Sequence, residues 1–285
     1  MAEPNATLVS AGIDVGSAAV KVAVMETDDQ GGERLLAGCV ERIRRRDPLA
    51  LVEALFDQAL AEAGLDRKRV DYVATTGEGE AVPFRTGHFY GMTTHARGAL
   101  FLDPEARAVL DIGALHTRAL NMDPKSRVLG YRMTSQCASG SGQFLENIAR
   151  YLGVTIEEIG PLSVSADKPE ACSSICAVLA ETDVINMVSR GISVPNILKG
   201  IHQSMAGRAV RLAISAGGRG VLMVTGGLAS DSGLITAMRE VPADPKAPLA
   251  IRSHPQSILA GALGAALWGG FRARRLAARS LPLAV

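Results

Sequence analysis

One arrangement of residues occurs twice in this chain, and it limits the possible folds more than any other feature. Residues 8–25 predict two apolar, β-branched strands joined by Asp14-Val-Gly-Ser17, because a short glycine-containing turn between such runs is typical of a hairpin. Residues 107–122 repeat this layout around the turn Asp111-Ile-Gly113. Asp-x-Gly turns are common, so coincidence is the alternative explanation. A true duplication predicts two related halves that face each other across a cleft.

The rest of the chain predicts helices that alternate with strands. With 285 residues, 47% of them hydrophobic, the chain is long enough for one large domain or two ordinary ones. Apolar periodicity, together with Gly and Pro as start and stop signals, gives the expected elements. Helices are expected over 48–64, 95–102, 141–152, 156–162, from Cys176, over 195–215 and over 257–277, and further strands over 35–43, 70–75 and 221–225. Gly160 and Pro161 are expected to end the helix over 156–162, and residues 163–175 are expected to form a loop.

Charge and composition exclude several classes of partner. Thirty basic and 29 acidic residues leave a formal net charge of +1, and aromatic residues make up 4% of the chain. Neither value favours nucleic acid or an anionic membrane surface. The first residues lack the basic and long apolar regions of a signal peptide, and no apolar run reaches the roughly 18 residues of a membrane span. We therefore expect a cytoplasmic protein.

A cysteine precedes a glycine-rich turn at Cys137, and the turn leads into an amphipathic helix. A helix that begins at Gly140-Ser141-Gly142 would present free backbone N–H groups and the positive end of its dipole, which suits a phosphate. The same position favours the thiolate form of Cys137, which binds metals or acts as a nucleophile. The alternative is a small-residue turn with a buried cysteine.

The chain contains four cysteines, Cys39, Cys137, Cys172 and Cys176. Four cysteines in a chain of this length do not indicate a disulfide framework. Cys39 lies in an expected strand and is interpreted as a small buried hydrophobic residue. Cys176 stands at the expected start of a helix, as Cys137 does.

Three turns together resemble the nucleotide loops of the sugar kinase, Hsp70 and actin superfamily. Asp14-x-Gly16-Ser17 resembles its first phosphate loop, Asp111-x-Gly113 its second, and Gly226-Gly227-x-Ala229 its adenosine loop. The resemblance implies an α/β, two-lobed ATPase fold, in which duplicated lobes of β-sheet and helices surround a nucleotide cleft. The expected lobes are residues 1–104, onto which a C-terminal helix in 257–285 packs back, and residues 105–256.

A second resemblance is more specific and covers the chain from Gly12 to about Trp268. Cys137-x-x-Gly-x-Gly-x-Phe-Leu-Glu146, followed by Cys176, resembles the BadF/BadG/BcrA/BcrD-type ATPase family. This family comprises the activator ATPases of 2-hydroxyacyl-CoA dehydratases and the ATPase subunits of ATP-dependent benzoyl-CoA reductase. Residues 111–118 and 133–150 look most like the D-type subunits of the reductase.

The family resemblance implies a set of site residues. Cys137 and Cys176 would each supply a thiolate to a 4Fe–4S cluster shared across a two-fold subunit interface, with Cys172 as the rival to Cys176. Asp14 and Asp111 would be the catalytic residues and would hold Mg²⁺ through water. For Lys21, a solvated strand residue is the alternative to a phosphate contact. The implied ATP-binding residues are Gly16, Ser17, Lys21, Gly113, Gly140, Ser141, Gly142, Gly226, Gly227 and Ala229.

The sequence also departs from the family pattern at two loops. Gly113-Ala-Leu-His116 stands where activator ATPases usually carry Gly-Gly-Gln-Asp, and Thr76-Gly-Glu-Gly-Glu80 stands where they usually carry Thr-Gly-Tyr-Gly-Arg. These departures favour a specialised subunit in a heterodimer with unequal nucleotide sites. Slow hydrolysis of bound ATP is the other explanation.

The implied function is ATP-coupled transfer of low-potential electrons from ferredoxin, through the cluster, to a partner that reduces benzoyl-CoA. The implied partners are a sister ATPase subunit, substrate-binding reductase subunits and ferredoxin. The alternatives are an activator of a 2-hydroxyacyl-CoA dehydratase and a small-metabolite kinase of the same superfamily. A kinase would have no need for paired cysteines, and a chaperone-like ATPase would require a peptide-binding domain for which the chain has no room.

Overall fold

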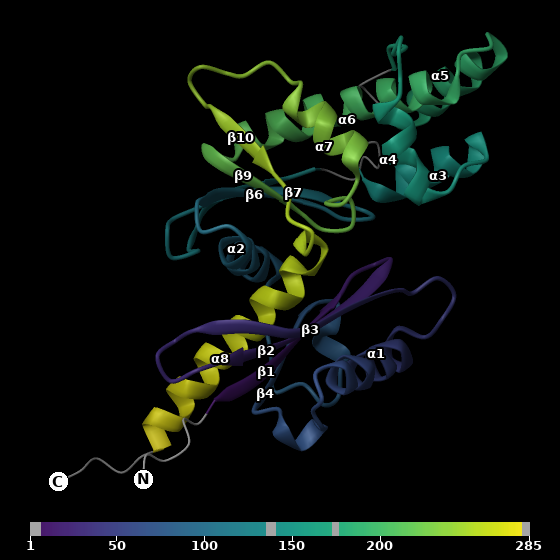
Figure 1. The fold of residues 1–285 in the computed structure, drawn as a ribbon. Helices are drawn as coiled ribbons and strands as arrows, with labels where there is room; N and C mark the ends of the chain where they lie inside the picture. Colours follow the sequence, from purple (N-terminus) through teal and green to yellow (C-terminus); the bar gives the residue numbers. More distant parts are fainter. Residues whose placement is uncertain (1–6, 135–140, 173–176, 281–285) are drawn as a thin grey trace. The chain divides into compact units, whose positions relative to one another are not determined.

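The structure is a computed structural model that describes residues 7–134, 141–172 and 177–280 (Figure 1). Contacts divide the chain into two compact units. Unit 1 consists of the chain up to Leu102 and from Leu259 onward, and unit 2 of Asp103–Ile258. No helix in the described ranges is long and apolar enough to cross a membrane.

Unit 1 contains a five-stranded sheet in the order β3-β2-β1-β4-β5. The pairs β1/β2 and β2/β3 are antiparallel, whereas β1/β4 and β4/β5 are parallel. Its strands are β1 (Leu8–Val15), β2 (Ala19–Thr27), β3 (Glu33–Arg42), β4 (Tyr72–Gly77) and β5 (Gly87–His88). Its α-helices are α1 (Pro48–Glu62), α2 (Gly91–Leu102) and α8 (Ala260–Ser280), and its 3-10 turns are Arg67–Arg69 and Gly79–Ala81.

The central strand β1 is buried on both faces because helices cover both. Its odd-numbered residues, such as Ile13, pack in one core with Phe56 and the other apolar residues of α1. Its even-numbered residues face α8, where Asp14 lies beside Gly261 and Ser10 beside Gly270. Both faces are therefore buried beyond Leu8, although the odd-numbered residues are apolar and the even-numbered Ser10, Gly12 and Asp14 are small or polar.

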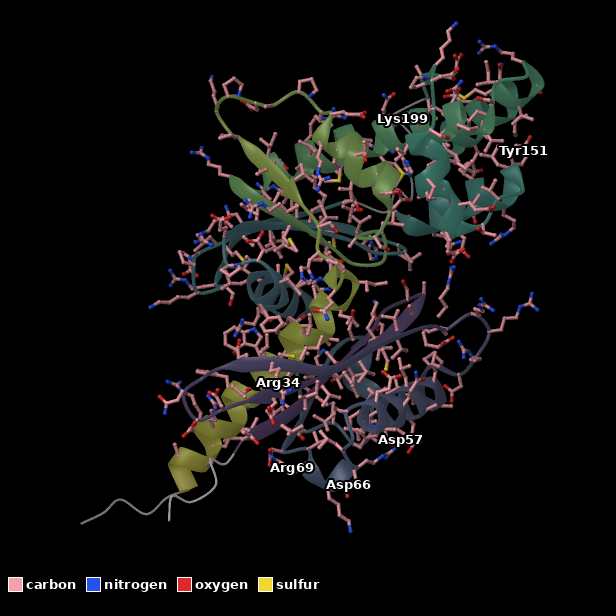
Figure 2. All side chains as sticks on the ribbon, viewed as in Figure 1. Arg34, Asp57, Asp66, Arg69, Tyr151 and Lys199 are labelled. Atoms are coloured by element: carbon pink, nitrogen blue, oxygen red, sulfur yellow. The ribbon has the colours of Figure 1, made fainter. Side chains whose placement is uncertain are left out.

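Unit 2 contains a second five-stranded sheet, in the order β10-β9-β6-β7-β8. Its strands are β6 (Ala106–Ile112), β7 (Thr117–Met122), β8 (Val128–Met133), β9 (Gly220–Thr225) and β10 (Leu249–Arg252). Its α-helices are α3 (Gly142–Leu152), α4 (Ile156–Val164), α5 (Ala177–Ser189), α6 (Val194–Ser215) and α7 (Ser232–Arg239). Buried residues of these helices share one hydrophobic core with β6, β7 and β9, and side chains fill the space between the sheet and its helices (Figure 2).

The two sheets have the same topology. In each, a meander of three antiparallel strands is followed by two parallel strands, and the first strand of the meander occupies the centre. The duplicated hairpin expected from the sequence is therefore confirmed by the strand order.

Several element boundaries differ from the sequence prediction. The helix α2 begins at Gly91, four residues before the expected start. The helix α4 does not end at Gly160 and Pro161 but continues to Val164. The strand β10 forms inside the proline-rich segment after α7, where no strand was expected, because it pairs in parallel with β9.

Candidate functional site

In unit 1, the aspartate of the first hairpin forms a buried ion pair. Asp14 and Lys21 are directly opposite each other in the register of β1 and β2, and Lys21 Nζ lies 3.0 Å from Asp14 Oδ2. Asp14 is 6% exposed and Lys21 8%. The interpretation of Lys21 as a solvated strand residue is therefore wrong. The pair fixes the carboxylate at the end of β1, next to the turn that carries Gly16 and the exposed Ser17.

Unit 2 repeats this ion pair at the corresponding position. Asp111, like Asp14, is the second-last residue of its strand, and its register partner on the returning strand is Arg118. Arg118 donates to Asp111 Oδ2 from Nε at 2.9 Å and from Nη2 at 2.5 Å. Asp111 is buried, whereas the Arg118 side chain is 34% exposed. Arg118 was not expected to be a site residue, although its seven-residue spacing from Asp111 equals that from Asp14 to Lys21.

A buried histidine on α2 also lies near Asp14. A Cβ placed on Gly261, near the start of α8, would lie 2.8 Å from Asp14 Oδ2 and 2.9 Å from His95 Nε2. The carboxylate and the imidazole therefore approach the same point of α8 from β1 and α2. No sequence pattern pointed to His95, because the contact depends on packing between α2 and α8.

In unit 2, the loop after Asp111 contacts the start of α3 directly. The Gly113 N–H donates to His116 O at 2.9 Å and closes the loop. The N–H groups of Gly142 and Gln143 donate to Gly113 O and Ala114 O, each at 2.9 Å. The expectation of free amides at the start of this helix is therefore wrong for these two positions. The loop after Asp111 and the helix start instead form one hydrogen-bonded structure.

The glycine turn after β9 lies against the same carboxylate. Gly226 has φ +87°, and a Cβ there would lie 2.4 Å from Asp111 Oδ1 and 2.7 Å from Ile112 O. The Leu228 N–H donates to Ile112 O at 3.3 Å. Unit 2 therefore brings together three segments that are far apart in the sequence: the Asp111 loop, the start of α3, and the turn that carries Gly226, Gly227 and Ala229.

We expect Gly226→Ala to destabilise unit 2 by about 1–3 kcal/mol more than Gly153→Ala, because only the first adds a methyl group where there is no room. Gly153 also has a positive φ, +72°, but a Cβ there would have nothing within 4 Å. Thermal unfolding followed by far-ultraviolet circular dichroism measures the difference. An equal decrease in stability for the two variants would mean that Gly226 is not packed closely against Asp111.

The predicted cluster ligands cannot be placed. Cys137, Cys176 and the phosphate-loop residue Gly140 lie outside the described residues. The rival ligand Cys172 is half-buried, and its Sγ lies 4.0 Å from the Ala180 carbonyl oxygen on α5. Within the described ranges, no group of three or more His, Cys, Asp and Glu side chains could hold a metal ion.

Cys39 is a buried structural cysteine, as expected. It is 6% exposed, and its Sγ donates to Glu62 Oε2 at 3.4 Å. Burial, followed by the hydrogen bond and the negative charge of Glu62, raises the pKa of the Cys39 thiol from 9.0 to about 11. The thiol is therefore neutral and unreactive near neutral pH.

We expect Cys39 to resist alkylation by iodoacetamide in the native protein at about pH 8, because the thiolate is the reactive form. The pKa of this thiol is 9.0 in an unfolded chain and about 11 in the folded protein. The stability that the folded state gains from keeping the thiol neutral is therefore complete below pH 9 and is lost as the pH rises towards 11. Peptide mass spectrometry measures the labelling. Labelling at the rate of a free cysteine before unfolding would contradict the buried, neutral assignment.

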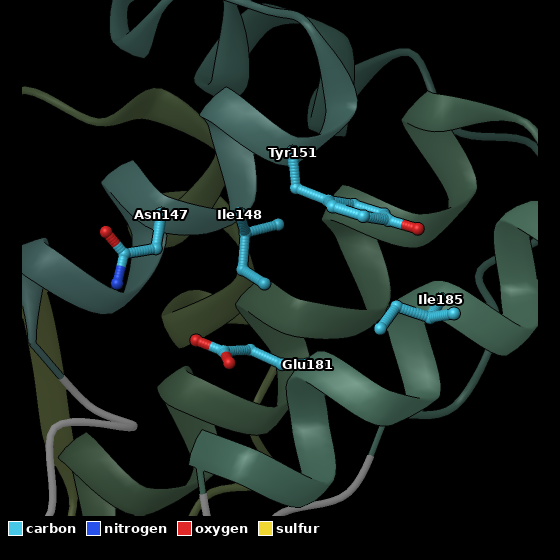
Figure 3. A pocket seen from close by; sticks show the side chains of 5 residues that line it. All are labelled: Asn147, Ile148, Tyr151, Glu181 and Ile185. Carbon is cyan, nitrogen blue, oxygen red and sulfur yellow. The ribbon is translucent and has the colours of Figure 1, made fainter.

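The pocket between α3 and α5 is the other notable feature of unit 2. It has a volume of about 220 Å³ and is lined by Asn147, Ile148, Tyr151, Glu181 and Ile185 (Figure 3). The Tyr151 and Ile185 side chains are 52% and 50% exposed, so the groove presents apolar surface to solvent. In the sequence, these two helices are the ones that follow Cys137 and Cys176.

Comparisons with known proteins agree with this arrangement. A model of the BadF/BadG/BcrA/BcrD ATPase family matches residues 11–269. The D-type subunit of benzoyl-CoA reductase from Thauera aromatica is 61% identical over 270 residues, which cover 94% of this chain and 95% of the relative. The activator of lactoyl-CoA dehydratase from Anaerotignum propionicum is 34% identical over 90% of this chain and 95% of the relative.

Solved structures have the same fold. The activator of the 2-hydroxyisocaproyl-CoA dehydratase from Clostridium difficile, with bound ADPNP, is 30% identical, covers 98% of this chain and all of its own, and superposes with a TM-score of 0.84. A ROK family glucokinase from Streptomyces griseus is 15% identical over 92% of this chain and 99% of its own, with a TM-score of 0.51, and shows the fold alone. The α/β fold of the actin and sugar kinase superfamily, expected from the three turns, is confirmed.

Proposed function

Because the chain belongs to the BadF/BadG/BcrA/BcrD ATPase family, we propose that it is the D-type subunit of an ATP-dependent benzoyl-CoA reductase. The observation that carries this proposal is 61% identity to such a subunit over nearly the full length of both chains. The activator of lactoyl-CoA dehydratase covers as much of its own length at 34% identity. The reductase assignment is therefore favoured over the activator assignment.

ATP is the proposed nucleotide, and the geometry of unit 2 supports it. The Asp111 carboxylate, the Gly113 loop and the turn at Gly226 meet at one place, and a relative with the same fold holds ADPNP. Asp14 and Asp111 are each held by a neighbouring cation at the end of a strand. A carboxylate of this kind suits hydrated Mg²⁺, which takes few carboxylates and keeps several waters.

A 4Fe–4S cluster is the proposed redox group, with Cys137 and Cys176 as its ligands from this chain. Such a cluster takes four thiolates, and it would supply low-potential one-electron chemistry. Because this chain would contribute two thiolates, a second subunit must contribute the other two. Cys172 fits the role less well, because it is half-buried against the Ala180 carbonyl on α5.

Exposed apolar residues on α3 and α5, the helices that follow those cysteines in the sequence, support a subunit interface. The side chains concerned are Tyr151, Leu179, Ile185 and Val188, which are between 43% and 52% exposed. Exposed large apolar residues that gather on one part of a surface are typical of a contact with another protein. We propose a sister ATPase subunit as the neighbour, with substrate-binding reductase subunits and ferredoxin completing the assembly.

The second phosphate loop favours a heterodimer over a homodimer. Leu115 and His116 stand where activators usually carry a Gln-Asp pair, and Leu115 is 50% exposed. A homodimer would carry this apolar substitution in both nucleotide sites. A sister subunit with the polar pair would leave one site equipped for hydrolysis.

Coupling to ATP is energetically reasonable for this reaction. Lowering the potential of one electron by 100 mV requires about 2.3 kcal/mol. The start of α3 is hydrogen-bonded to the Gly113 loop, so a change at the phosphates would reach the helix that follows Cys137. ATP binding and hydrolysis would then drive the electron onward, as nucleotide switches do in other proteins.

The function is tested by co-expressing a sister ATPase subunit and the substrate-binding subunits, with and without this chain. We expect ATP-dependent, ferredoxin-driven reduction of benzoyl-CoA only when this chain is present. The same preparations should fail to activate a 2-hydroxyacyl-CoA dehydratase. Activation of the dehydratase without benzoyl-CoA reduction would replace the proposal with the activator function.

A further inference from the structure

A buried serine and a buried histidine meet an aspartate in unit 2, beside the turn that carries Gly226, Gly227 and Ala229. His202 lies on α6 and is fully buried. Its Nδ1 is 2.8 Å from Ser163 Oγ on α4, and its Nε2 is 3.3 Å from Asp231 Oδ2 at the start of α7. One side chain thus connects three helices, and none of the three residues was identified from the sequence.

This cluster is not arranged for nucleophilic catalysis. A catalytic serine must be reachable by its substrate. Ser163 and His202 have no exposed surface. A role in holding neighbouring elements fits their burial better than a role in bond making.

Asp231 connects the cluster to the glycine turn after β9. Its N–H donates to Leu228 O at 3.1 Å and so closes the turn, while its Oδ1 accepts from Leu234 N at 3.0 Å and caps α7. Within the turn, the Ala229 N–H donates to Gly226 O at 3.1 Å. The conformation of the turn therefore depends on where Asp231 is held.

His202 Nε2 lies 3.3 Å from Asp231 Oδ2, so the imidazole and the carboxylate are in contact. Burial raises the pKa of Asp231, but the hydrogen bond and charge of His202, together with the N–H groups of Leu234 and Gly233, outweigh it and lower the pKa. Space is short as well, because a Cβ on Gly233 would lie 2.5 Å from His202 Nδ1. The imidazole that contacts Asp231 therefore has little freedom to move.

We propose that His202 is a positioning residue for nucleotide binding: by holding Asp231, it keeps the Gly226–Ala229 turn in the conformation that accepts ATP. The inference rests on the proposed function, in which this turn contacts the adenosine part of ATP. Ser163 Oγ contacts the other ring nitrogen, Nδ1, while close packing against Gly233 holds the imidazole in place. The nucleotide turn thereby becomes dependent on a residue in the middle of α6.

Two substitutions at His202 separate positioning from general packing. The amide nitrogen of Gln reaches about where Nε2 lies and can still face Asp231, whereas the shorter Asn reaches about where Nδ1 lies and can face only Ser163. We expect His202→Gln to bind Mg·ADPNP within about twofold of wild type. We expect His202→Asn to bind about tenfold more weakly, a loss typical of removing one polar contact to a carboxylate.

Two further variants make the test independent of how well His202→Asn folds. Asp231→Asn keeps a good helix cap but loses the charge, so it should also bind about tenfold more weakly. Ser163→Ala lowers stability but leaves the contact between His202 and Asp231 in place. Its affinity for Mg·ADPNP should therefore stay within about twofold of wild type. Calorimetry on the full chain gives the dissociation constants, and thermal unfolding gives the stabilities.

The possible results distinguish this inference from the function on which it rests. Weak binding confined to His202→Asn and Asp231→Asn supports it. If the affinity for Mg·ADPNP falls in proportion to the loss of stability in all four variants, the positioning role is overturned, but the proposal that the chain binds ATP stands. A wild-type chain that does not bind Mg·ADPNP would overturn the proposed function and this inference together.

Discussion

Replacing Cys137 or Cys176 with serine is expected to remove the iron from the assembled protein, whereas Cys39→Ser is expected to leave it unchanged. A 4Fe–4S cluster needs thiolate ligands, and these two cysteines are the ones that the family resemblance assigns to it. Cys39 is buried in β3, and its pKa is raised to about 11, so it is unsuited to bind iron. Iron and acid-labile sulfide, measured on anaerobically purified protein, give the result.

Cys172→Ser is the matched control for this experiment, because Cys172 is only four residues from Cys176. We expect it to retain the iron. Loss of iron in Cys172→Ser with retention in Cys176→Ser would move the ligand to Cys172. Full iron content in either Cys137→Ser or Cys176→Ser would reject that residue as a ligand.

Lys21→Met is expected to lower the free energy of unfolding by about 3–5 kcal/mol, because it leaves the Asp14 charge buried without its cation. Asp14 is 6% exposed, and its Oδ2 lies 3.0 Å from Lys21 Nζ. The single tryptophan, Trp268 on α8, belongs to the same unit. Its fluorescence during urea unfolding therefore reports on the unit that contains the pair.

Arg34→Met is the control for Lys21→Met, since Arg34 forms an ion pair on the same sheet but in solvent. Arg34 Nη2 lies 2.7 Å from Glu26 Oε2, and the Arg34 side chain is 70% exposed (Figure 2). Such a pair contributes about 0–1 kcal/mol. We expect the double variant Asp14→Asn, Lys21→Met to recover most of the loss. A Lys21→Met protein as stable as Arg34→Met would show that Asp14 is not held by the pair.

The duplicated topology could be predicted because each half begins with a local pattern. A hairpin forms between neighbouring segments, so its strands and its turn can be read from residues 8–25 alone. The register that places Asp14 opposite Lys21 is known only from the structure, because the sequence indicated the hairpin but not which residues pair. The equivalent Arg118 was missed because residues 118–122 were read only as a returning strand.

Elements that depend on distant contacts could not be predicted. The strand β10 is a short segment that becomes a strand by pairing with β9. The helix α4 continues past Pro161, since its start is stabilised by a capping box between Thr155 and Glu158 and it packs on α6 and α7. Tertiary packing outweighs the local stop signal in this helix.

In the candidate site too, features set by neighbouring residues could be predicted, whereas features set by contacts between distant segments could not. The turns that carry Gly113 and Gly226 could be recognised from their residues, but their approach to one carboxylate is a property of the β6/β9 pairing. His95 and His202 could not be recognised, because each acts through residues on other elements. Single buried histidines in helices are usually interpreted as core residues.

The shared cluster is tested most directly by the iron content of this chain purified alone, compared with that of the chain purified with its sister ATPase subunit, both without oxygen. We predict an iron-poor chain alone, and about four irons and four sulfides per pair after co-expression, since one 4Fe–4S cluster is shared. Only the pair should then donate electrons to the reductase subunits when ATP is added. A stable homodimer of this chain that carries one full cluster and donates electrons by itself would contradict the shared, heterodimeric cluster.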